Sequence, residues 1–561
     1  MAQQRLIPPH DSPGSYAPEQ QPIWRIWPWI NRHPRSILIA LIALSLTIAC
    51  YQSATKLFWC DELITLAIAR QGSFAGIWRA LAAGADPNPP LSHWLVLEST
   101  RAFGDGELAV RLPAVLCTAI AIVSLWTILR RWVCPGYAAA GVLTFMATRG
   151  FDYAYNARSY APLMGFSMAS LALWLASTER TGWARFAALA GMATALALGL
   201  SSNYYGALAF LPIALGEAVR AAKGFPDCAS NPLPAEGSSL VAGRVQPGVW
   251  VAMVFAALPL LAFLPLIRRD IAEFAPHAWN RTHAGMIVES YLNLVEAVFW
   301  PVFGLALYAT WKRWRQSTHR VMSGPLWSGR SAVQPHEAAA LGVLILYPTL
   351  GYLVAAGGAD IIGARCVVPV CCGFGIAAGL LGRRIFGKSP RAGAMFLSTA
   401  LLWVVARESA CAIILVKQRT AFLALRDYVA LQPLDRTIVV SDSLFVLPLA
   451  HYSTDGVRAR ILFPIDFDAI HVHEPDDSIE QNLWAGRNGI FPITIVAYDR
   501  SLFAGRELTL IARPDGWLAH RLISDCFHLS QPDHNPAWQH VGGVFTSLDH
   551  DETRLQLIMD N

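Results

Sequence analysis

The stretch LAVRLPAVLCTAIAIVSLWTILRRW, residues 108–132, decides the class of fold. It is long and apolar enough to cross a bilayer, because a spanning helix needs about 20 mainly apolar residues. Runs of this kind recur along the chain of 561 residues, of which 54% are hydrophobic and 15% are charged. Soluble proteins carry roughly a quarter charged residues. The sequence therefore predicts an α-helical polytopic membrane protein and excludes a disordered, coiled-coil or ordinary cytosolic one.

About eleven segments qualify as membrane spans when a hydropathy window is moved along the chain. Besides residues 108–132, they are 36–51, 137–148, 160–176, 183–200, 205–219, 249–266, 292–310, 338–356, 364–381 and 396–415. The segment 137–148 is short for a span. Stretches rich in Pro, Gly and Ser at 226–247 and 316–335 indicate linkers between spans.

Basic residues set the expected orientation, because Lys and Arg beside a span resist translocation. They occur on alternate connections, which we expect to be cytoplasmic: Arg130, Arg131, Arg220, Lys223, Lys312, Arg313, Arg315, Arg383, Arg384 and Lys388. Residues 1–35 then form a cytoplasmic tail, and the first span is a retained anchor rather than a cleaved signal. An odd number of spans places the C-terminus outside. The net charge of +5 is too small and too scattered to indicate nucleic acid as a partner.

Composition divides the chain into a membrane domain at residues 36–415, with a large first outer loop at 52–107, and a second domain at 416–561. After Lys417 charges return, and β-branched runs at 437–440, 493–496 and 508–511 lie between helix-like segments. This pattern predicts a small extracytoplasmic α/β domain. Recognition or shielding of a substrate and a purely structural cap both remain open as its role.

The first outer loop opens with Phe58-Trp59-Cys60-Asp61-Glu62 and continues with apolar residues at helical spacing as far as residue 81. We expect an amphipathic helix in the lipid interface, with Asp61 at its N-terminus near the membrane surface. An acidic pair in this position also caps a helix and interacts favourably with the positive end of the helix dipole. Asp61 and Glu62 therefore have a structural alternative to a chemical role.

Four outer connections carry acids, arginines or tyrosines at one membrane depth. Beyond Asp61 and Glu62, the residues are Asp86, Asn88, Asp152, Arg158, Tyr160, Asn203, Tyr204, Tyr205 and Arg365. Ionisable groups near the bilayer are costly and tend to line a polar cavity. Arg158 and Arg365 lie on the side where basic residues are disfavoured, so their presence needs a reason, such as binding an anionic group. For each residue alone an ion pair is the alternative, and only the convergence of these residues favours a site.

In their order along the chain these residues resemble the GT-C superfamily of membrane glycosyltransferases. The similarity is to its protein O-mannosyltransferase and aminoarabinose-transferase-like branch, which includes the bacterial RgtA/B/C/D-like enzymes. It runs through Trp59-x-Asp61-Glu62, Asp86-Pro87-Asn88-Pro89-Pro90-Leu91, residues 104–112, Ala157-Arg158-Ser159-Tyr160-Ala161, Asn203-Tyr204-Tyr205-Gly206 and Gly363-Ala364-Arg365. The resemblance covers residues 59–206 well and the remaining spans by topology only.

The chain departs from this family pattern at three positions. The family usually has His where this chain has Asn88, often has an acid in place of Asn156, and often has His in place of Asn203. Asparagine keeps hydrogen bonding but cannot titrate near neutral pH. The resemblance therefore carries no metal-binding or proton-transfer role to these three residues.

The resemblance implies a sugar donor linked by phosphate to a polyprenol. It implies transfer, with inversion, to a glycan, lipid or protein acceptor on the outer face of a bacterial inner membrane. Asp61 would act as the base, while Glu62 and Asp152 would orient the acceptor or bind a cation. Arg158 and Arg365 would hold the phosphate, and the neighbouring spans would hold the lipid tail. No fixed cofactor or metal-ligand set is implied, and a divalent cation stays open.

Two other functional classes remain alternatives at this point. A lipid-linked-sugar flippase or transporter would carry its site near the bilayer midplane in broken helices, whereas the acids and arginines here gather in outer connections. A catalytically silent scaffold is the second alternative, because the three asparagines replace titratable groups and fold does not determine function.

A separate pattern in the second domain is His471-Val472-His473-Glu474, followed by Asp476 and Asp477. Its spacing resembles that of metal ligands, but the sequence offers no fixed third ligand. We interpret it as a solvated loop.

Overall fold

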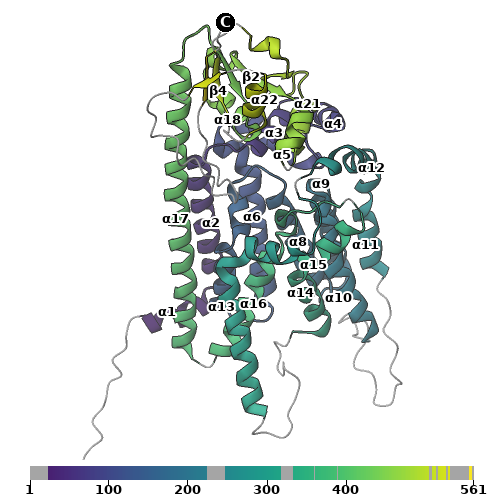
Figure 1. Cartoon of the computed structure of the whole chain (residues 1–561). Helices are drawn as coiled ribbons and strands as arrows, with labels where there is room; N and C mark the ends of the chain where they lie inside the picture. Colours follow the sequence, from purple (N-terminus) through teal and green to yellow (C-terminus); the bar gives the residue numbers. More distant parts are fainter. Residues whose placement is uncertain are drawn as a thin grey trace, which may run out of the picture.

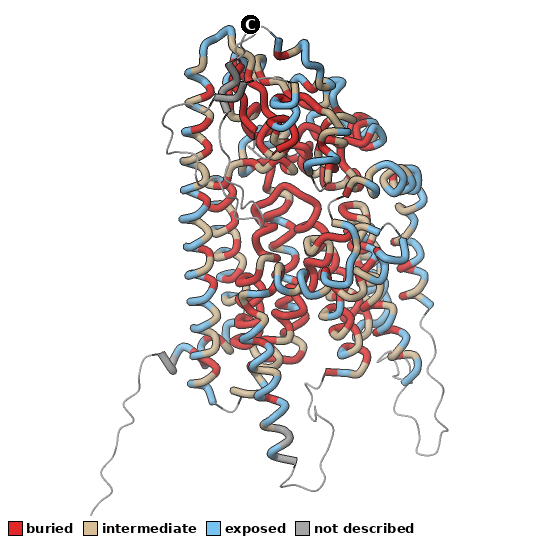
Figure 2. The backbone as a smooth tube through the Cα atoms, in the orientation of Figure 1, coloured by how far each residue is buried: buried red, intermediate tan, exposed pale blue. Residues whose placement is uncertain are grey.

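The computed structural model describes residues 23–223, 247–317, 333–530 and 555–558, apart from residues 279, 359, 388, 475, 505–507, 513–515, 526 and 527. Most of the expected N-terminal tail and of the two expected linkers lies outside the described residues. A bundle of helices forms the larger part of the molecule, and a smaller part containing a sheet lies at one end of it (Figure 1). Buried backbone is concentrated in the middle of both parts, and exposed backbone follows the outer helices (Figure 2).

Seven helices among the described residues are long and apolar enough to cross a membrane. They are α2 (Pro34–Thr55), α6 (Glu107–Arg130), α8 (Tyr160–Ser177), α9 (Gly182–Ser202), the turn η2 (Tyr204–Ala209) with α10 (Phe210–Ala222), α13 (Gly285–Ser317) and α17 (Pro390–Ala430). The short helix α1 (Ile23–Arg32) precedes them. The chain is a multi-pass integral membrane protein.

Two bent pairs of helices raise the number of spans to nine among the described residues. In one, α11 (Pro247–Ala257) meets the stretch of α12 (Pro259–Arg269), η3 (Asp270–Phe274) and η4 (Ala275–His277) at 43°. In the other, α14 (Pro335–Ile345) meets α15 (Tyr347–Ala356) at 64°. Pro259 and Pro348 lie in the first turn of the second helix of each pair. Each proline removes a backbone donor, which explains the breaks.

The other two expected spans are α7 (Pro135–Met146) and α16 (Val370–Phe386), with 12 and 17 residues. Helix α7 is shorter than a full span, and α16 is at the lower limit of about 17 residues. Among the described residues, length and composition therefore support up to nine spans, fewer than the expected number of about eleven. The two helices pack closely in the bundle, where all of α7 is buried. A Cβ added to Gly375 would lie only 2.7 Å from the carbonyl oxygen of Gly141. Small residues at this crossing are therefore required for the backbones to approach.

Helix α17 connects the two parts of the molecule. Its 41 residues reach roughly 60 Å at 1.5 Å per residue, about twice the thickness of the hydrocarbon core of a bilayer. Leu402 is exposed, as on a lipid-facing helix surface, whereas Leu425 and Val429 are buried in the hydrophobic core of the sheet-containing part. The helix therefore continues from the membrane into that part without a break.

The C-terminal part contains a six-stranded sheet in the order β3-β2-β1-β4-β6-β5. The strands are β1 (Thr437–Val440), β2 (Ile461–Ile465), β3 (Thr494–Ala497), β4 (Leu508–Ile511), β5 (His528–Ser530) and β6 (Leu555–Ile558). The first four are parallel, and β6 runs antiparallel to both β4 and β5. The helices and turns between them are α18 (Ser443–Tyr452), α19 (Asp455–Arg458), α20 (Phe467–His473), α21 (Ser478–Ala485), η6 (Arg500–Leu502) and α22 (Trp517–Ser524). The three expected strands are confirmed as β1, β3 and β4, with β3 shifted by one residue.

The first outer loop forms three helices, α3 (Cys60–Ala69), α4 (Phe74–Ala83) and α5 (Leu91–Phe103). The expected continuous helix to residue 81 is wrong, because Gly72 adopts φ +72° and Ser73 starts a new helix by accepting a hydrogen bond from the Gly76 N–H. The expected position of α3 in the lipid interface is wrong too. Every α3 residue except Asp61 is buried, and Leu63 shares a hydrophobic core with the C-terminal part.

A buried ion pair fixes the start of α3 against the bundle. Arg111 of α6 donates to both carboxylate oxygens of Glu62, at 2.7 and 2.8 Å, and neither side chain has any exposed surface. Lys56 lies 3.3 Å from the same carboxylate. The backbone N–H groups of Trp59 and Ala157 donate to it at 3.1 and 2.8 Å. Glu62 thereby joins the end of α2, the start of α3, α6 and the loop before α8.

The positive charges of Arg111 and Lys56 keep the buried Glu62 carboxyl ionised. Burial alone raises the pKa of Glu62, but Arg111 and Lys56 outweigh it and lower the pKa to about 2. Burial is also the main reason that the pKa of Lys56 falls to about 8. Removing one member of a buried ion pair leaves the other charge without compensation, which typically costs about 3–5 kcal/mol.

The Glu62→Gln substitution tests this contact. The amide keeps the shape of the side chain but removes the carboxylate charge that pairs with Arg111 and Lys56, so we expect the free energy of unfolding to fall by about 3–5 kcal/mol. Thermal unfolding of the purified protein in detergent measures the change. Glu98→Gln is the matched control, because Glu98 pairs with Arg101 on the surface and such pairs contribute about 1 kcal/mol or less. Equal stability losses in the two variants would contradict the assignment.

Candidate active site

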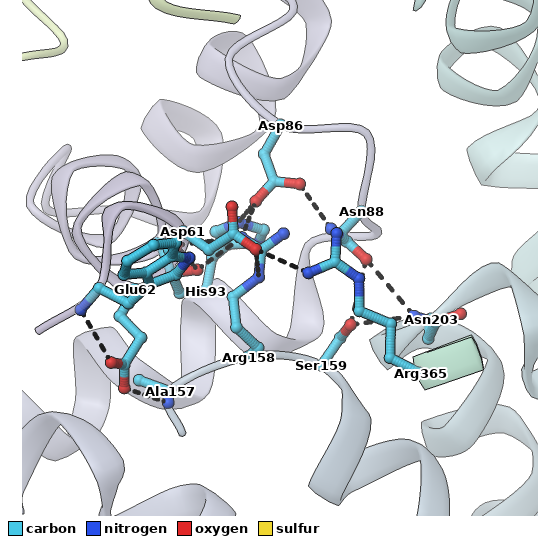
Figure 3. A network of polar contacts seen from close by, with 12 residues as sticks. Asp61, Glu62, Asp86, Asn88, His93, Ala157, Arg158, Ser159, Asn203 and Arg365 are labelled. Carbon is cyan, nitrogen blue, oxygen red and sulfur yellow. Dashed lines mark hydrogen bonds and ion pairs between the residues drawn. The ribbon is translucent and has the colours of Figure 1, made fainter. Parts of the chain in front are cut away.

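Asp61 is the acidic residue of the first turn of α3 that faces a cavity. Its Oδ2 atom lies 3.0 Å from Nη1 of Arg365, which comes from the turn η5 (Ala364–Val367), and 3.8 Å from Nε of Arg158 (Figure 3). The Arg365 guanidinium also lies 5.5 Å from the centre of the Tyr160 ring. Three segments distant in sequence therefore place a carboxylate between two guanidinium groups.

Arg158 is held in place mainly by one of its terminal nitrogens. Nη1 lies 2.5 Å from Oδ2 of Asp86, and it donates to Oγ1 of Thr65 and to the backbone oxygen of Asp61, both at 3.1 Å. Its Nε atom is buried and makes no hydrogen bond within the described part of the chain. Arg158 is thus fixed through Nη1, while its buried Nε lies 3.8 Å from Asp61 Oδ2.

Asp86 is the buried counter-charge of Arg158. Burial alone raises the pKa of this carboxyl, but Arg158, with contributions from His93 and Asn88, holds the pKa well below its ordinary value. His93 Nε2 lies 3.4 Å from Oδ2, and Asn88 Nδ2 donates to Oδ1 at 2.5 Å. The Asp86–Arg158 pair therefore remains charged over the physiological pH range.

A chain of amides and one hydroxyl continues from Asp86 to the start of η2. Ser159 Oγ donates to Oδ1 of Asn88 at 3.1 Å, and Asn203 Nδ2 donates to Ser159 Oγ at 2.9 Å (Figure 3). Asn203 Oδ1 accepts from the backbone N–H of Tyr205 at 3.0 Å and caps η2. Asn88 and Asn203 thus have defined hydrogen-bonding roles that require no titratable group.

These side chains surround a cavity of about 340 Å³ between the bundle and the C-terminal part. Its polar lining consists of Asp61, Asn88, Arg158, Tyr160, Asn203, Tyr204, Tyr205, Asp270, Asn280, Arg365, Ser478 and Asn482. Its apolar lining includes Leu208, Ile267, Ile271, Phe274, Val354, Ile361 and Ile479. A lining of this mixed kind fits an amphiphile with an anionic group.

Eight of the eleven residues expected from the sequence line the cavity, and Glu62, Asp86 and Asp152 do not. Figure 3 shows Glu62 directed away from Asp61 and toward Ala157. Asp152, in η1 (Arg149–Tyr155), accepts two hydrogen bonds of 2.7 Å from Arg407 of α17. These three acids lie outside the cavity and fix the segments around it. Glu62 pairs with Arg111, Asp86 pairs with Arg158, and Asp152 joins η1 to α17 through Arg407.

Four polar residues of the lining were not expected from the sequence: Asp270, Asn280, Ser478 and Asn482. Asp270 starts η3 and Asn280 follows η4, whereas Ser478 and Asn482 belong to α21 of the C-terminal part. No local motif marks them. The only sequence signal was for Asp270, an acid that follows Arg268 and Arg269 at the end of an apolar run. Many spans end in this way, so the signal does not single out a site residue.

One family model matches part of the chain. Residues 87–235 match the family model of dolichyl-phosphate-mannose-protein mannosyltransferases. The matched region contains Asn88, Arg158 and Asn203 but neither Asp61 nor Arg365. No curated protein sequence matches the chain.

Solved structures of ArnT share the fold over most of the chain. ArnT from Cupriavidus metallidurans in the apo state has 14% sequence identity and a TM-score of 0.56, and the match covers 92% of this chain and 97% of that one. The same ArnT bound to undecaprenyl phosphate has 13% identity, a TM-score of 0.54 and the same coverage of both chains. The helical bundle with its appended sheet thus has the fold of ArnT. The family model matches only the part of the chain from residue 87 to residue 235.

The pH dependence of stability follows from the two buried acids behind the site. Folding lowers the pKa of Glu62 from 4.5 to about 2, and it lowers the pKa of Asp86 as well. A carboxyl whose pKa is lowered on folding contributes stability above its unfolded pKa and loses it as the pH falls. We therefore expect the melting temperature in detergent to fall as the pH drops from about 4.5 toward 2.

The variants Glu62→Gln and Asp86→Asn should each show a shallower fall over this range than the parent protein, because each lacks one of the protons taken up on unfolding. A parallel fall in all three proteins would show that neither acid has a lowered pKa.

Proposed function

We propose that this protein transfers a sugar from a polyprenyl-phosphate donor to an acceptor at the outer face of the membrane, with Asp61 as the base. The observation that carries the proposal is the Asp61 carboxylate beside the guanidinium groups of Arg158 and Arg365 in one cavity. The family description, which names a dolichyl-phosphate sugar, and the ArnT structure with undecaprenyl phosphate support a lipid-phosphate donor.

The donor phosphate would bind between the two arginines. Arg365 is the more accessible, with 31% of its side chain exposed, whereas the Arg158 side chain is 9% exposed and borders the same cavity. Guanidinium groups pair with phosphate oxygens through parallel hydrogen bonds. The apolar lining from Ile267, Ile271 and Val354 would accept the first part of the lipid tail.

In the reaction, a nucleophilic oxygen or nitrogen of the acceptor attacks the anomeric carbon of the sugar. The bond from that carbon to the phosphate oxygen breaks, and the phosphate leaves on the polyprenol with its electron pair. The proton of the nucleophile passes to Asp61. Arg158 and Arg365 stabilise the negative charge that develops on the leaving phosphate, which needs no proton to depart.

In a direct displacement the nucleophile attacks from the face opposite the leaving phosphate, so we propose inversion at the anomeric carbon. Arg365 must exchange its contact with Asp61 for the phosphate as the donor binds. This exchange frees the carboxylate to accept a proton at the moment when the phosphate is in place. A product with the anomeric configuration of the donor, determined from proton coupling constants, would exclude this direct displacement.

We also propose that the N-terminus is cytoplasmic and that the cavity and residues 416–561 are extracytoplasmic, as in a bacterial inner membrane. Arg130, Arg131, Arg383 and Arg384 surround a second pocket at the far ends of α6 and α16. Arg130 is 19 residues beyond Arg111 along α6, a distance of roughly 28 Å at 1.5 Å per residue. Basic residues favour the cytoplasmic side.

The Asp61→Asn substitution tests the proposed base. We expect about 100- to 10,000-fold slower transfer, the usual contribution of a positioned general base, with normal folding in detergent. Mass spectrometry of membrane lipids and glycans with and without the gene identifies the product, and its rate of formation is then measured in membranes. The control is Asp105→Asn, an exposed acid paired with Arg70, which should leave the rate unchanged. Full turnover by the Asp61 variant removes Asp61 from the mechanism.

The Arg365→Gln substitution tests the phosphate site. We expect at least about tenfold weaker binding of undecaprenyl phosphate, since a hydrogen bond to a charged group contributes about 1.5–3 kcal/mol. Arg365→Lys should bind with intermediate affinity because it keeps the charge but loses the paired hydrogen bonds. Arg101→Gln, which changes an exposed arginine paired with Glu98, is the control. Unchanged affinity in both Arg365 variants would place the phosphate elsewhere.

A further inference from the structure

Two histidines and an aspartate meet where the membrane bundle touches the C-terminal part. His277 ends η4, His471 belongs to α20, and Asp477 immediately precedes α21. His277 Nδ1 lies 2.8 Å from Asp477 Oδ1, and His471 Nε2 lies 3.0 Å from Asp477 Oδ2. One ligand atom from each residue lies within 4.8 Å of the other two. The structure thus supplies a third ligand, His277, from a segment about 200 residues away.

The Asp477 carboxylate is buried in this cluster, with 2% of its side chain exposed. Gln481 Nε2 donates to Oδ2 at 2.8 Å. Within the described residues, neither lysine nor arginine lies at ion-pair distance from it. A buried carboxylate is costly unless a cation compensates it, and here one imidazole approaches each of its two oxygens.

The donor set selects the kind of cation. Two imidazole nitrogens with one carboxylate oxygen is a combination used for zinc, with bonds of about 2.0–2.2 Å and a fourth position for water. Such bonds place ligand atoms roughly 3.3 Å apart in a tetrahedron, so separations of up to 4.8 Å must close by as much as about 1.5 Å when the ion binds. His471 has half of its side chain exposed and can make that adjustment. Mg²⁺ and Ca²⁺ prefer ligand sets made of oxygen atoms, whereas two of the three ligands here are imidazole nitrogens.

His473, the other histidine of the His471-Val472-His473 run, does not belong to the cluster. Its ring stacks on His520, with ring centres 4.4 Å apart. The rings of His277 and His471, in contrast, lie nearly parallel with centres 5.8 Å apart on the two sides of Asp477. His473 is therefore a matched internal control for His471, two positions away on the same helix.

We propose that His277, His471 and Asp477 bind one Zn²⁺ ion, which clamps the segment after α12 to the start of α21. Asp270 and Phe274 on one side of this clamp, and Ser478 and Asn482 on the other, line the candidate active-site cavity. Arg269 holds the same segment to the end of α4 by donating to the Leu81 backbone oxygen at 3.0 Å. Zinc thus fixes the wall that the C-terminal part contributes to the cavity. The site is independent of which sugar or acceptor the enzyme uses.

Zinc binding is tested on the full-length protein in detergent, with any affinity tag removed and bound metal stripped by a chelator. The protein is equilibrated with ZnCl₂ alone, desalted and analysed for metal content. We expect one zinc per chain, and at least about tenfold weaker binding after His277→Ala, His471→Ala or Asp477→Asn. His473→Ala should bind zinc like the parent protein.

A second readout separates loss of the ligand from loss of the fold. A ligand that binds only the folded state raises the melting temperature by mass action, so zinc should stabilise the parent and the His473 variant but not the three ligand variants. Each variant is first checked for a monodisperse elution profile, and His277→Gln replaces His277→Ala if the latter aggregates. A parent that binds no zinc, or ligand variants that bind it as tightly as the parent, overturns the proposal and leaves a hydrogen-bonded contact only.

Discussion

A carboxylate and a guanidinium without exposed surface, those of Glu62 and Arg111, meet where α2, α3, α6 and the loop before α8 converge. Their charges cannot be left unpaired in this environment, so the four segments must keep one arrangement. The consequence for the site is direct. Asp61 precedes Glu62, and Arg158 follows Ala157, whose N–H donates to Glu62. One buried ion pair therefore sets the relative positions of the carboxylate and the guanidinium that face the cavity.

The polar residues of the site fall into two groups. The Asp86–Arg158 pair and the hydrogen-bonded chain from Asn88 to Asn203 are largely buried and hold one another in place. Asp61 and Arg365 are more exposed, and they can change partners when a ligand enters. Such a division suits the proposed sugar transfer, in which the lipid phosphate is held firmly while a carboxylate remains free to take up a proton. The C-terminal part closes the cavity through α21, which supports a role beyond that of a structural cap.

The sequence predicted what depends on local pattern. Apolar runs gave the spans, and Asp61, Arg158 and Arg365 stood out because charges on the outer side of spans need a reason. The break between α3 and α4 was missed because the apolar spacing continues across Gly72. Glu62 and Asp152 were assigned to the site because the sequence cannot tell a carboxylate that faces a cavity from one that faces Arg111 or Arg407. Asp270 and His277 gain their importance from partners far away in the chain, which no local pattern reveals.

The central claim is that one cavity holds the donor phosphate between Arg158 and Arg365 with Asp61 beside it. A cryo-electron microscopy structure of the protein with undecaprenyl phosphate tests it most directly. The account predicts phosphate density within hydrogen-bonding distance of both guanidinium groups, with Arg365 turned away from Asp61 to reach it. Phosphate density at the other end of the bundle, beside Arg383 and Arg384, would contradict it.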